Sequence, residues 1–371
     1  MTDFSIRTKI IFDLPLQVFF STLDSRSVFI VADPMMEKLG FTKKITDTLC
    51  QKKIAYEVFS EVTPDPKVEV IAKGLGKMNS FKPTHLVAIG GGSAIDTAKG
   101  MVLSNYKLFS DYQKPTFVAI PSTSGTGSEV TSFTVITNGE DKKPFVEEAL
   151  IPDIAILDVD LVKSVPPKVS ADTGMDVLTH ALEAYVSTNA STFTDALAEK
   201  TVKLVFENLP KIYQNPNDLV ARDLMHKAST LAGMAFTNAS LGINHSLAHA
   251  IGGTFHLPHG RINAVLMAGV VEYNAKNQCA AEKYQQMAKE LGLPAETAEM
   301  GVKHLIMAIR YLNKALGIAD YFEEVGIVSA EYINRKDQII TLALADACTA
   351  TNPRTPDSQS LGELYLSFFK N

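Results

Sequence analysis

The first 165 or so residues alternate short apolar runs with amphipathic stretches of helical spacing. The apolar runs predict strands at residues 27–33, 54–62, 84–90, 116–121 and 153–158. Helical spacing occupies residues 35–53 and 68–81 between them. Short apolar strands interleaved with amphipathic helices are typical of a parallel sheet covered by helices, so we predict an α/β domain here.

The pattern changes after the double proline at positions 166 and 167, where a domain boundary is expected. Strand-like alternation is scarce beyond this point. Segments with helical period follow at residues 175–187, 194–209, 221–236, 280–292, 298–317 and 336–348. We therefore predict an N-terminal α/β domain over residues 1–168 and an all-helical domain over residues 169–371.

Composition narrows the possible functions of the chain. Of its 371 residues, 46% are apolar and 20% charged, which is typical of a globular protein, and the net charge of −6 offers no basic face for nucleic acid. The three cysteines are far apart, so neither disulfides nor a thiolate zinc site are expected. We find no signal peptide and no apolar run of membrane-spanning length, and a reducing cytoplasm is the expected compartment.

Two loops at predicted strand ends are candidates for nucleotide binding. Gly90, Gly91, Gly92 and Ser93 lie between a strand and a helix, where backbone N–H groups and the helix N-terminus favour a pyrophosphate. A tight packing turn is the competing interpretation. The next strand ends in the hydroxyl-rich segment PSTSGTGSEVT (121–131), which could also be an ordinary surface loop. Because successive parallel strands end at one edge of a sheet, both loops are expected in one crevice.

Asp33 ends the strand at residues 27–33 and could accept hydrogen bonds from an adenosine ribose. Its charge would repel a 2′-phosphate and so favour NAD over NADP. An exposed loop acid is the competing interpretation of Asp33.

Four of the eight histidines fall within NHSLAHAIGGTFHLPHG, residues 244–260. His245 and His249 share one helical face, as do Asp176 and His180 farther upstream, and His259 follows ten residues after His249. Imidazole and carboxylate donors without thiolate favour Fe(II), Zn(II) or Mn(II). No HExxH pattern is present, which disfavours a metalloprotease.

Other residues near these histidines leave alternatives open. The role of His256 is ambiguous, and Asp172 is either a second-choice carboxylate ligand or a helix cap. Isolated histidines are more often structural than ligating, and we interpret His85, His226 and His304 in this way.

Several segments together resemble the iron-containing (group III) alcohol dehydrogenase family over essentially the whole chain. They are GGGSAIDTAK, PSTSGTGSEVT, TGMDVLTHALEAYVS and GINHSLAHAIGGTFHLPHG. The segments FSEVTPDP, ASTFTDALAEKTVKLVF, ASTLAGMAF and FHLPHG are most similar to the 1-propanol dehydrogenases of propanediol utilisation. One departure is Arg261, where relatives usually carry a small or aliphatic residue.

The resemblance implies a set of site residues. Metal ligands are expected at Asp176, His180, His245 and His259, with His249 as a proton relay and not a ligand. NAD contacts are expected at Asp33, Asp65, Gly91, Gly92, Ser93, Thr123, Thr126, Thr131 and a lysine that is either Lys142 or Lys143, of which we choose Lys142. The substrate is expected against Phe133, Val135, Phe236 and Cys348.

The activity implied by the resemblance is reversible, NADH-dependent reduction of a short-chain aldehyde such as propionaldehyde to a primary alcohol. Fe(II), or alternatively Zn(II), would polarise the carbonyl. Ethanol or butanol dehydrogenases of the same family are alternatives. A metal- and NAD-dependent lyase of the dehydroquinate synthase type is more remote, because the expected pocket is apolar, and a non-catalytic shell-associated protein is improbable. A homodimer and association with a bacterial microcompartment are further expectations.

Overall fold

The computed structural model describes residues 3–139 and 141–369, with the side chains of Asp141 and Lys142 left out. The chain divides into two compact units. One comprises Ser5–Ser164, and the other comprises the chain from Val165 onward together with the N-terminal segment that includes Phe4.

A six-stranded parallel sheet forms the centre of the first unit, with strand order β1-β8-β5-β4-β2-β3. Its strands are β1 (Lys9–Phe12), β2 (Ser27–Ala32), β3 (Ala55–Phe59), β4 (His85–Gly90), β5 (Thr116–Pro121) and β8 (Ile154–Leu157). The five predicted strands are confirmed. Strand β1 was not predicted, because it is a four-residue edge strand without a fully buried position and so has a weak apolar pattern.

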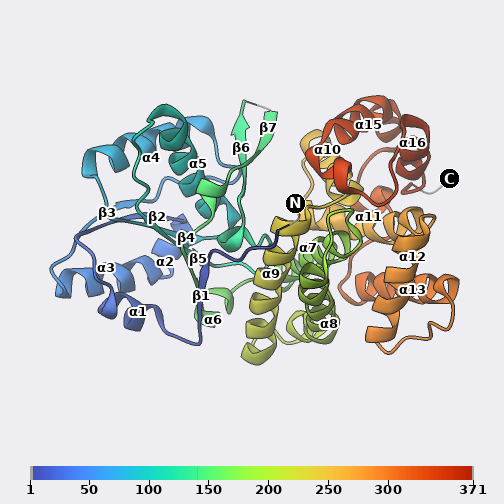
Figure 1. Ribbon diagram of the computed structural model, residues 1–371, viewed down its shortest axis with the longest axis horizontal. Coiled ribbons are helices and arrows are strands. Elements are labelled where there is room, and N and C mark those ends of the chain that lie inside the picture. The colour runs from blue at the N-terminus through green and yellow to red at the C-terminus, as the bar shows by residue number, and fades with distance from the viewer. Residues whose placement is uncertain (1–2, 140, 370–371) are drawn as a thin grey trace. The chain divides into compact units, whose positions relative to one another are not determined.

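Helices cover both faces of this sheet (Figure 1). They are α1 (Leu16–Thr22), α2 (Pro34–Lys38), α3 (Phe41–Gln51), α4 (Val68–Phe81), α5 (Gly92–Leu108) and α6 (Val159–Val162). In β2, Val28 and Ile30 pack on the side of α1 and α3, whereas Phe29 and Val31 pack on the side of α4 and α5. Burial on both faces explains why a central strand such as β2 is apolar at consecutive positions.

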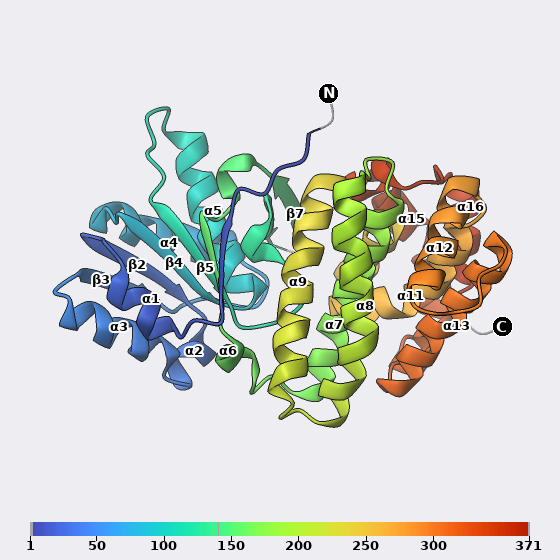
Figure 2. The same cartoon turned by 60° about the horizontal axis from the view of Figure 1, so that its bottom comes forward.

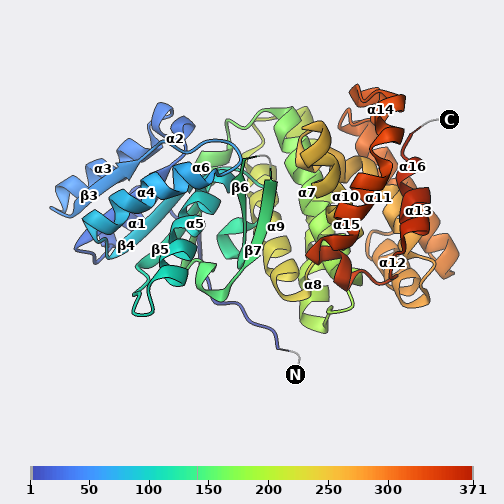
Figure 3. The same ribbon diagram turned by 90° about the horizontal axis from the view of Figure 1, so that it is seen from above.

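The single helix predicted over residues 35–53 is two helices. Gly40, between α2 and α3, has a φ of 78°, a left-handed conformation that ends the first helix. The hairpin of β6 (Phe133–Asn138) and β7 (Asp141–Val146) was also not predicted, and it packs beside α5 (Figure 3). Two short 3₁₀ helices lie nearby, η1 (Ser128–Val130) and η2 (Glu148–Leu150).

Only helices occur in the described part of the second unit, as predicted. The longest are α7 (Pro167–Val186), α8 (Thr192–Gln214) and α9 (Leu219–Ala239), which lie side by side (Figure 2). The remaining elements are α10 (Ile243–Phe255), α11 (His259–Asn274), α12 (Gln278–Glu290), α13 (Ala298–Ala315), η3 (Phe322–Val325), α14 (Ser329–Asn334), α15 (Lys336–Ala345), η4 (Ala347–Thr351) and α16 (Ser358–Leu366). Among the described helices, none is both long and apolar enough to cross a lipid bilayer.

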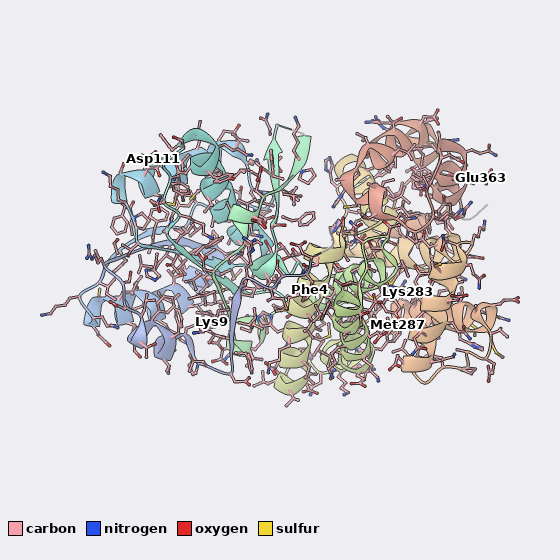
Figure 4. All side chains as sticks on the ribbon, in the orientation of Figure 1. Phe4, Lys9, Asp111, Lys283, Met287 and Glu363 are labelled. Atoms are coloured by element: carbon pink, nitrogen blue, oxygen red, sulfur yellow. The ribbon has the colours of Figure 1, made fainter. Side chains whose placement is uncertain are left out.

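Helix α7 is the buried centre of this unit. Lys283 of α12, labelled in Figure 4, donates to the Tyr185 carbonyl at 2.6 Å and to the Asp195 carboxylate at 2.9 Å, which ties α12 to α7 and α8. Every residue of α7 from Gly174 to Val186 is buried. Polar side chains in such a helix are costly unless other groups bind them, so the polar residues of α7 need nearby partners.

Candidate active site

The polar face of α7 carries Asp176, His180 and Glu183, which are four and three residues apart and therefore share one side of the helix. All three side chains are buried. Helix α10 brings His245 and His249 to the same region, and His259 is the first residue of α11. The structure thus collects the four predicted metal ligands from three helices of one unit.

Donor atoms of these residues lie close to one another. Oδ1 of Asp176 lies 3.7 Å from Nε2 of His245 and 3.5 Å from Nε2 of His259. Donor atoms of Asp176, His180 and His245 all lie within 4.8 Å of one another. Ligands of a tetrahedral metal with bonds of about 2.1 Å are roughly 3.4 Å apart, so these separations fit a metal ion.

Neighbouring residues orient this donor set. Oε2 of Glu183 lies 2.5 Å from Nδ1 of His245, which leaves Nε2 of that ring facing the other donors. The amide nitrogen of Asn263 donates to Oδ1 of Asp176 at 2.7 Å and lies 3.1 Å from Nε2 of His259. Phe236 stacks on the His180 ring, with centroids 4.5 Å apart, so the predicted substrate residue Phe236 does adjoin a predicted ligand.

Close packing of α11 against α7 places His259. A Cβ atom at Gly260 would lie 2.1 Å from the Asp172 carbonyl oxygen, so only glycine fits at this position. The next residue, Arg261, donates from Nε to Oδ1 of Asp172 at 2.6 Å. Asp172 is therefore the partner of Arg261; it lies inside α7 and does not cap it. His256 ends α10 in a left-handed conformation, with φ 54°.

The electrostatics of the cluster suit a bound cation. Burial alone would raise the pKa of Asp176, but the imidazoles of His180, His259 and His245 hold that pKa well below its usual range. Burial opposes protonation of His245, yet Glu183 and Asp176 raise its pKa to about 9. The cluster thus stabilises positive charge at its centre, and the residues present fit a divalent metal.

A second group of side chains adjoins the first. Nδ1 of His249 lies 2.8 Å from Oδ2 of Asp346, and the His249 ring is nearly parallel to that of His259, at 5.3 Å between centroids. Burial alone would raise the pKa of Asp346, but His249 lowers it to about 2. Cys348 is buried beside Asp346, and burial keeps the pKa of its thiol well above the usual range.

The predicted nucleotide loops do meet in the first unit. Gly91 caps α5, and Cβ atoms at Gly91 and Gly92 would lie 3.5 Å and 2.9 Å from side-chain atoms of Thr123 and Thr126 respectively. Gly90 has a φ of 151°, and a Cβ there would lie 2.6 Å from that of Asp33. The glycine loop, the hydroxyl loop and Asp33 therefore share one edge of the sheet, as expected from the strand ends.

Lys99 and Asp96 of α5 fix the start of the hairpin. The fully buried Nζ of Lys99 donates to the carbonyl of Thr131 at 2.8 Å, to its hydroxyl at 3.0 Å and to the carbonyl of Phe133 at 2.7 Å. Asp96 accepts from the Ser128 hydroxyl at 2.8 Å and from the Val135 amide at 3.3 Å. These bonds position Thr131, Phe133 and Val135.

Three further predicted cofactor contacts, Asp33, Asp65 and Lys142, lie outside the two loops in the sequence. Asp33 is the N-cap of α2, and its Oδ1 accepts from the Met35 amide at 2.7 Å. Asp65 has a φ of 55°. Lys67, two residues later, forms an isolated β-bridge with Thr137, and Thr137 is paired with Lys142 in the hairpin. The side chain of Lys142 lies outside the described residues, so the choice between it and Lys143 stays a prediction.

Sequence reasoning missed five residues of these two regions: Asp96, Lys99, Glu183, Asn263 and Asp346. Four of them could have been found from the sequence. Each lies three to six positions after a predicted site residue (Ser93, His180 or His259) on the same helix. No sequence pattern indicated Asp346, because it lies 97 positions after His249.

Comparison with known families covers both units. Residues 15–159 match the model of the iron-containing alcohol dehydrogenases, and residues 170–369 match that of the C-terminal part of the Fe-containing alcohol dehydrogenase family. The solved iron-containing alcohol dehydrogenase of Thermococcus thioreducens superposes with a TM-score of 0.91 at 33% identity, covering 99% of each chain.

Individual relatives are similar along most of the chain. The 1-propanol dehydrogenase PduQ of Citrobacter freundii is 41% identical over 98% of this chain and 99% of its own. The NADPH-dependent butanol dehydrogenase of Clostridium saccharobutylicum is 40% identical, over 92% of this chain and 90% of its own. The aldehyde-alcohol dehydrogenase of Streptococcus pneumoniae is 42% identical, but this chain spans only 43% of its length.

Proposed function

Because this chain belongs to the iron-containing alcohol dehydrogenase family, we propose that it catalyses the reversible, NADH-dependent reduction of short-chain aldehydes to primary alcohols. The observation that carries this proposal is the cluster of Asp176, His180, His245 and His259, of which the first three are buried. Propionaldehyde is the preferred substrate in the proposal, since 1-propanol dehydrogenase PduQ is similar over the whole chain.

When bound, the metal supplies Lewis-acid polarisation of the carbonyl, and NADH supplies the hydride. The chain's own residues hold the metal, orient its ligands and transfer the proton. Asp176, His180, His245 and His259 would hold the metal, and Glu183 keeps Nε2 of His245 directed at it. His249 would deliver a proton to the product oxygen in reduction and accept it in oxidation.

Phe236 and Cys348 supply apolar surface for a short alkyl chain. Phe236 is buried and stacks on His180, and the Cys348 thiol stays protonated at neutral pH. Phe133 and Val135 are the remaining proposed substrate contacts. No charged side chain is among these four positions, which suits an uncharged aldehyde.

Cofactor binding is proposed at the converging loops of the first unit. The backbone N–H groups of Gly91, Gly92 and Ser93 lie at the N-terminal end of α5, where a pyrophosphate is favoured. The remaining proposed contacts are Asp33, Asp65, Thr123, Thr126, Thr131 and Lys142. We also propose domains at residues 1–168 and 169–371, a homodimer, and a cytoplasmic location that includes association with a microcompartment.

The proposal is tested by purifying the protein without oxygen in the presence of Fe(II) and supplying NADH with C2 to C4 aldehydes. We expect NADH consumption matched by alcohol formation, with the highest kcat/KM for propionaldehyde. Removal of the metal by a chelator should abolish turnover, and Fe(II) should restore it. Turnover that survives complete metal removal would refute the proposed role of the cluster.

A further inference from the structure

Asp346 connects two parts of the helical unit through its two carboxylate oxygens. Oδ2 lies 2.8 Å from Nδ1 of His249 on α10, and Oδ1 accepts a hydrogen bond of 2.8 Å from the backbone amide of Cys348 in η4. The Asp346 side chain is 11% exposed, whereas that of His249 is 35% exposed. A nearly buried carboxylate therefore holds one nitrogen of a ring whose remainder is accessible.

This arrangement determines which nitrogen of His249 carries the proton. A carboxylate can only accept, so Nδ1 of a neutral His249 must be the N–H donor. Its Nε2 is then left with a free lone pair. The same carboxylate also stabilises the positive charge that develops when Nε2 takes up a proton.

We propose that Asp346 is a positioning residue of the dehydrogenase reaction, which holds His249 in the Nδ1–H form so that Nε2 exchanges the proton of the alcohol. The inference rests on the proposed function, because it assigns a task to His249 in alcohol–aldehyde interconversion. Asp346 acts only through His249, and the Cys348 amide fixes its carboxylate from the other side.

The backbone contact makes one substitution especially informative. In Asp346→Asn, the Cys348 amide still needs an acceptor, so the amide oxygen of the new side chain is expected to face it. The NH₂ group then faces His249, whose Nδ1 becomes the acceptor. His249 is thereby forced into the Nε2–H form, with nearly unchanged shape and packing.

Kinetics test the functional consequence. We expect Asp346→Asn to keep its metal and its KM for propanol while kcat for propanol oxidation falls roughly 10²-fold, as for loss of general acid–base catalysis. His249→Gln should lose a similar factor, and the double variant should be no slower than either single variant. The matched control is Asp357→Asn, which alters the N-cap of α16 in the same conservative way.

Nitrogen NMR tests the same inference without turnover. In Zn(II)-loaded protein with ¹⁵N-labelled histidine, the signals of His249 are those that disappear in His249→Gln. We expect the Nδ1–H pattern in the wild type and the Nε2–H pattern in Asp346→Asn. If the wild type lacks dehydrogenase activity, the proposed function fails, yet these spectra still decide the role of Asp346.

Three results would overturn the inference. They are an Nε2–H pattern for His249 in the wild type, wild-type kcat in Asp346→Asn, and multiplicative losses in the double variant. The first needs only the wild type and His249→Gln, so it remains available if Asp346→Asn does not fold.

Discussion

Oε2 of Glu183 lies 2.5 Å from Nδ1 of His245, and Oε1 of the same carboxylate accepts a hydrogen bond of 2.6 Å from the backbone N–H of Asn244. The acid thus fixes both the His245 ring and the first turn of α10. A carboxylate on the far nitrogen of a ligating histidine increases its basicity and sets its tautomer. The His245 ring is therefore aligned for metal binding before any metal arrives.

Glu183→Gln should weaken metal binding without abolishing it. The amide retains part of the hydrogen bonding but lacks the charge that supports His245, so we expect a loss of about 10- to 100-fold in metal affinity. Competition against a chelator measures this loss. Glu199→Gln on α8 is a matched control, since Glu199 bonds only the Tyr185 hydroxyl in the described contacts. Unchanged affinity in Glu183→Gln would show that the carboxylate does not support the metal site.

Asp33→Asn should narrow the preference for NADH over NADPH. Asparagine can keep the cap on the Met35 amide but removes the negative charge beside the proposed 2′ position. We expect the ratio of kcat/KM values for the two cofactors to fall by roughly tenfold, which corresponds to about 1.4 kcal/mol. Glu37→Gln makes the same charge change on the same helix and should leave the ratio unaltered. An equal effect in both variants would assign the change to overall charge.

The Arg261–Asp172 pair should stabilise the fold more than it affects catalysis. Arg261→Ala leaves Asp172 partly buried without its partner, and we expect a loss of about 2 kcal/mol in the free energy of unfolding. Asp172→Asn in the same chain should recover part of this loss, because it removes the uncompensated charge. Denaturant titration of the two variants measures both effects. Equal stability of Arg261→Ala and wild type would exclude a structural role for the pair.

Acid should destabilise the protein through His226. Burial lowers the pKa of this imidazole from 6.5 to about 4, so the folded state keeps it neutral while the unfolded chain protonates. The contribution of neutral His226 to the free energy of unfolding is complete above pH 6.5 and is lost as the pH falls toward 4. Denaturant titration at pH 7.5 and at pH 5 measures this effect. Between these two pH values, the free energy of unfolding should fall by about 2 kcal/mol more in the wild type than in His226→Gln. The control His304→Gln should behave like the wild type, and identical pH dependence of the free energy of unfolding in all three proteins would refute this assignment.

Sequence patterns predicted the long helices, the four strands that are largely buried (β2, β4, β5 and β8) and the more exposed β3, since continuous or periodic apolar residues indicate such elements. They failed at β1 and at the β6–β7 hairpin, where half-exposed residues and Pro144 disguise the strands. Spacing brought Asp176 and His180, and likewise His245 and His249, onto shared helix faces. It could not separate the proposed ligand His245 from the proposed relay His249, because the partners of the two rings, Glu183 and Asp346, are brought to them by tertiary packing.

The central claim is that a metal held by Asp176, His180, His245 and His259 enables this chain to reduce aldehydes. The most direct test measures iron per chain and NADH-dependent propionaldehyde reduction on the same preparations of wild type, His245→Ala and the control His304→Ala. We expect His245→Ala to keep its helical circular dichroism but to lose most of its iron and at least about 10²-fold of its turnover. The control should keep both. Full iron occupancy with wild-type turnover in His245→Ala would contradict the account.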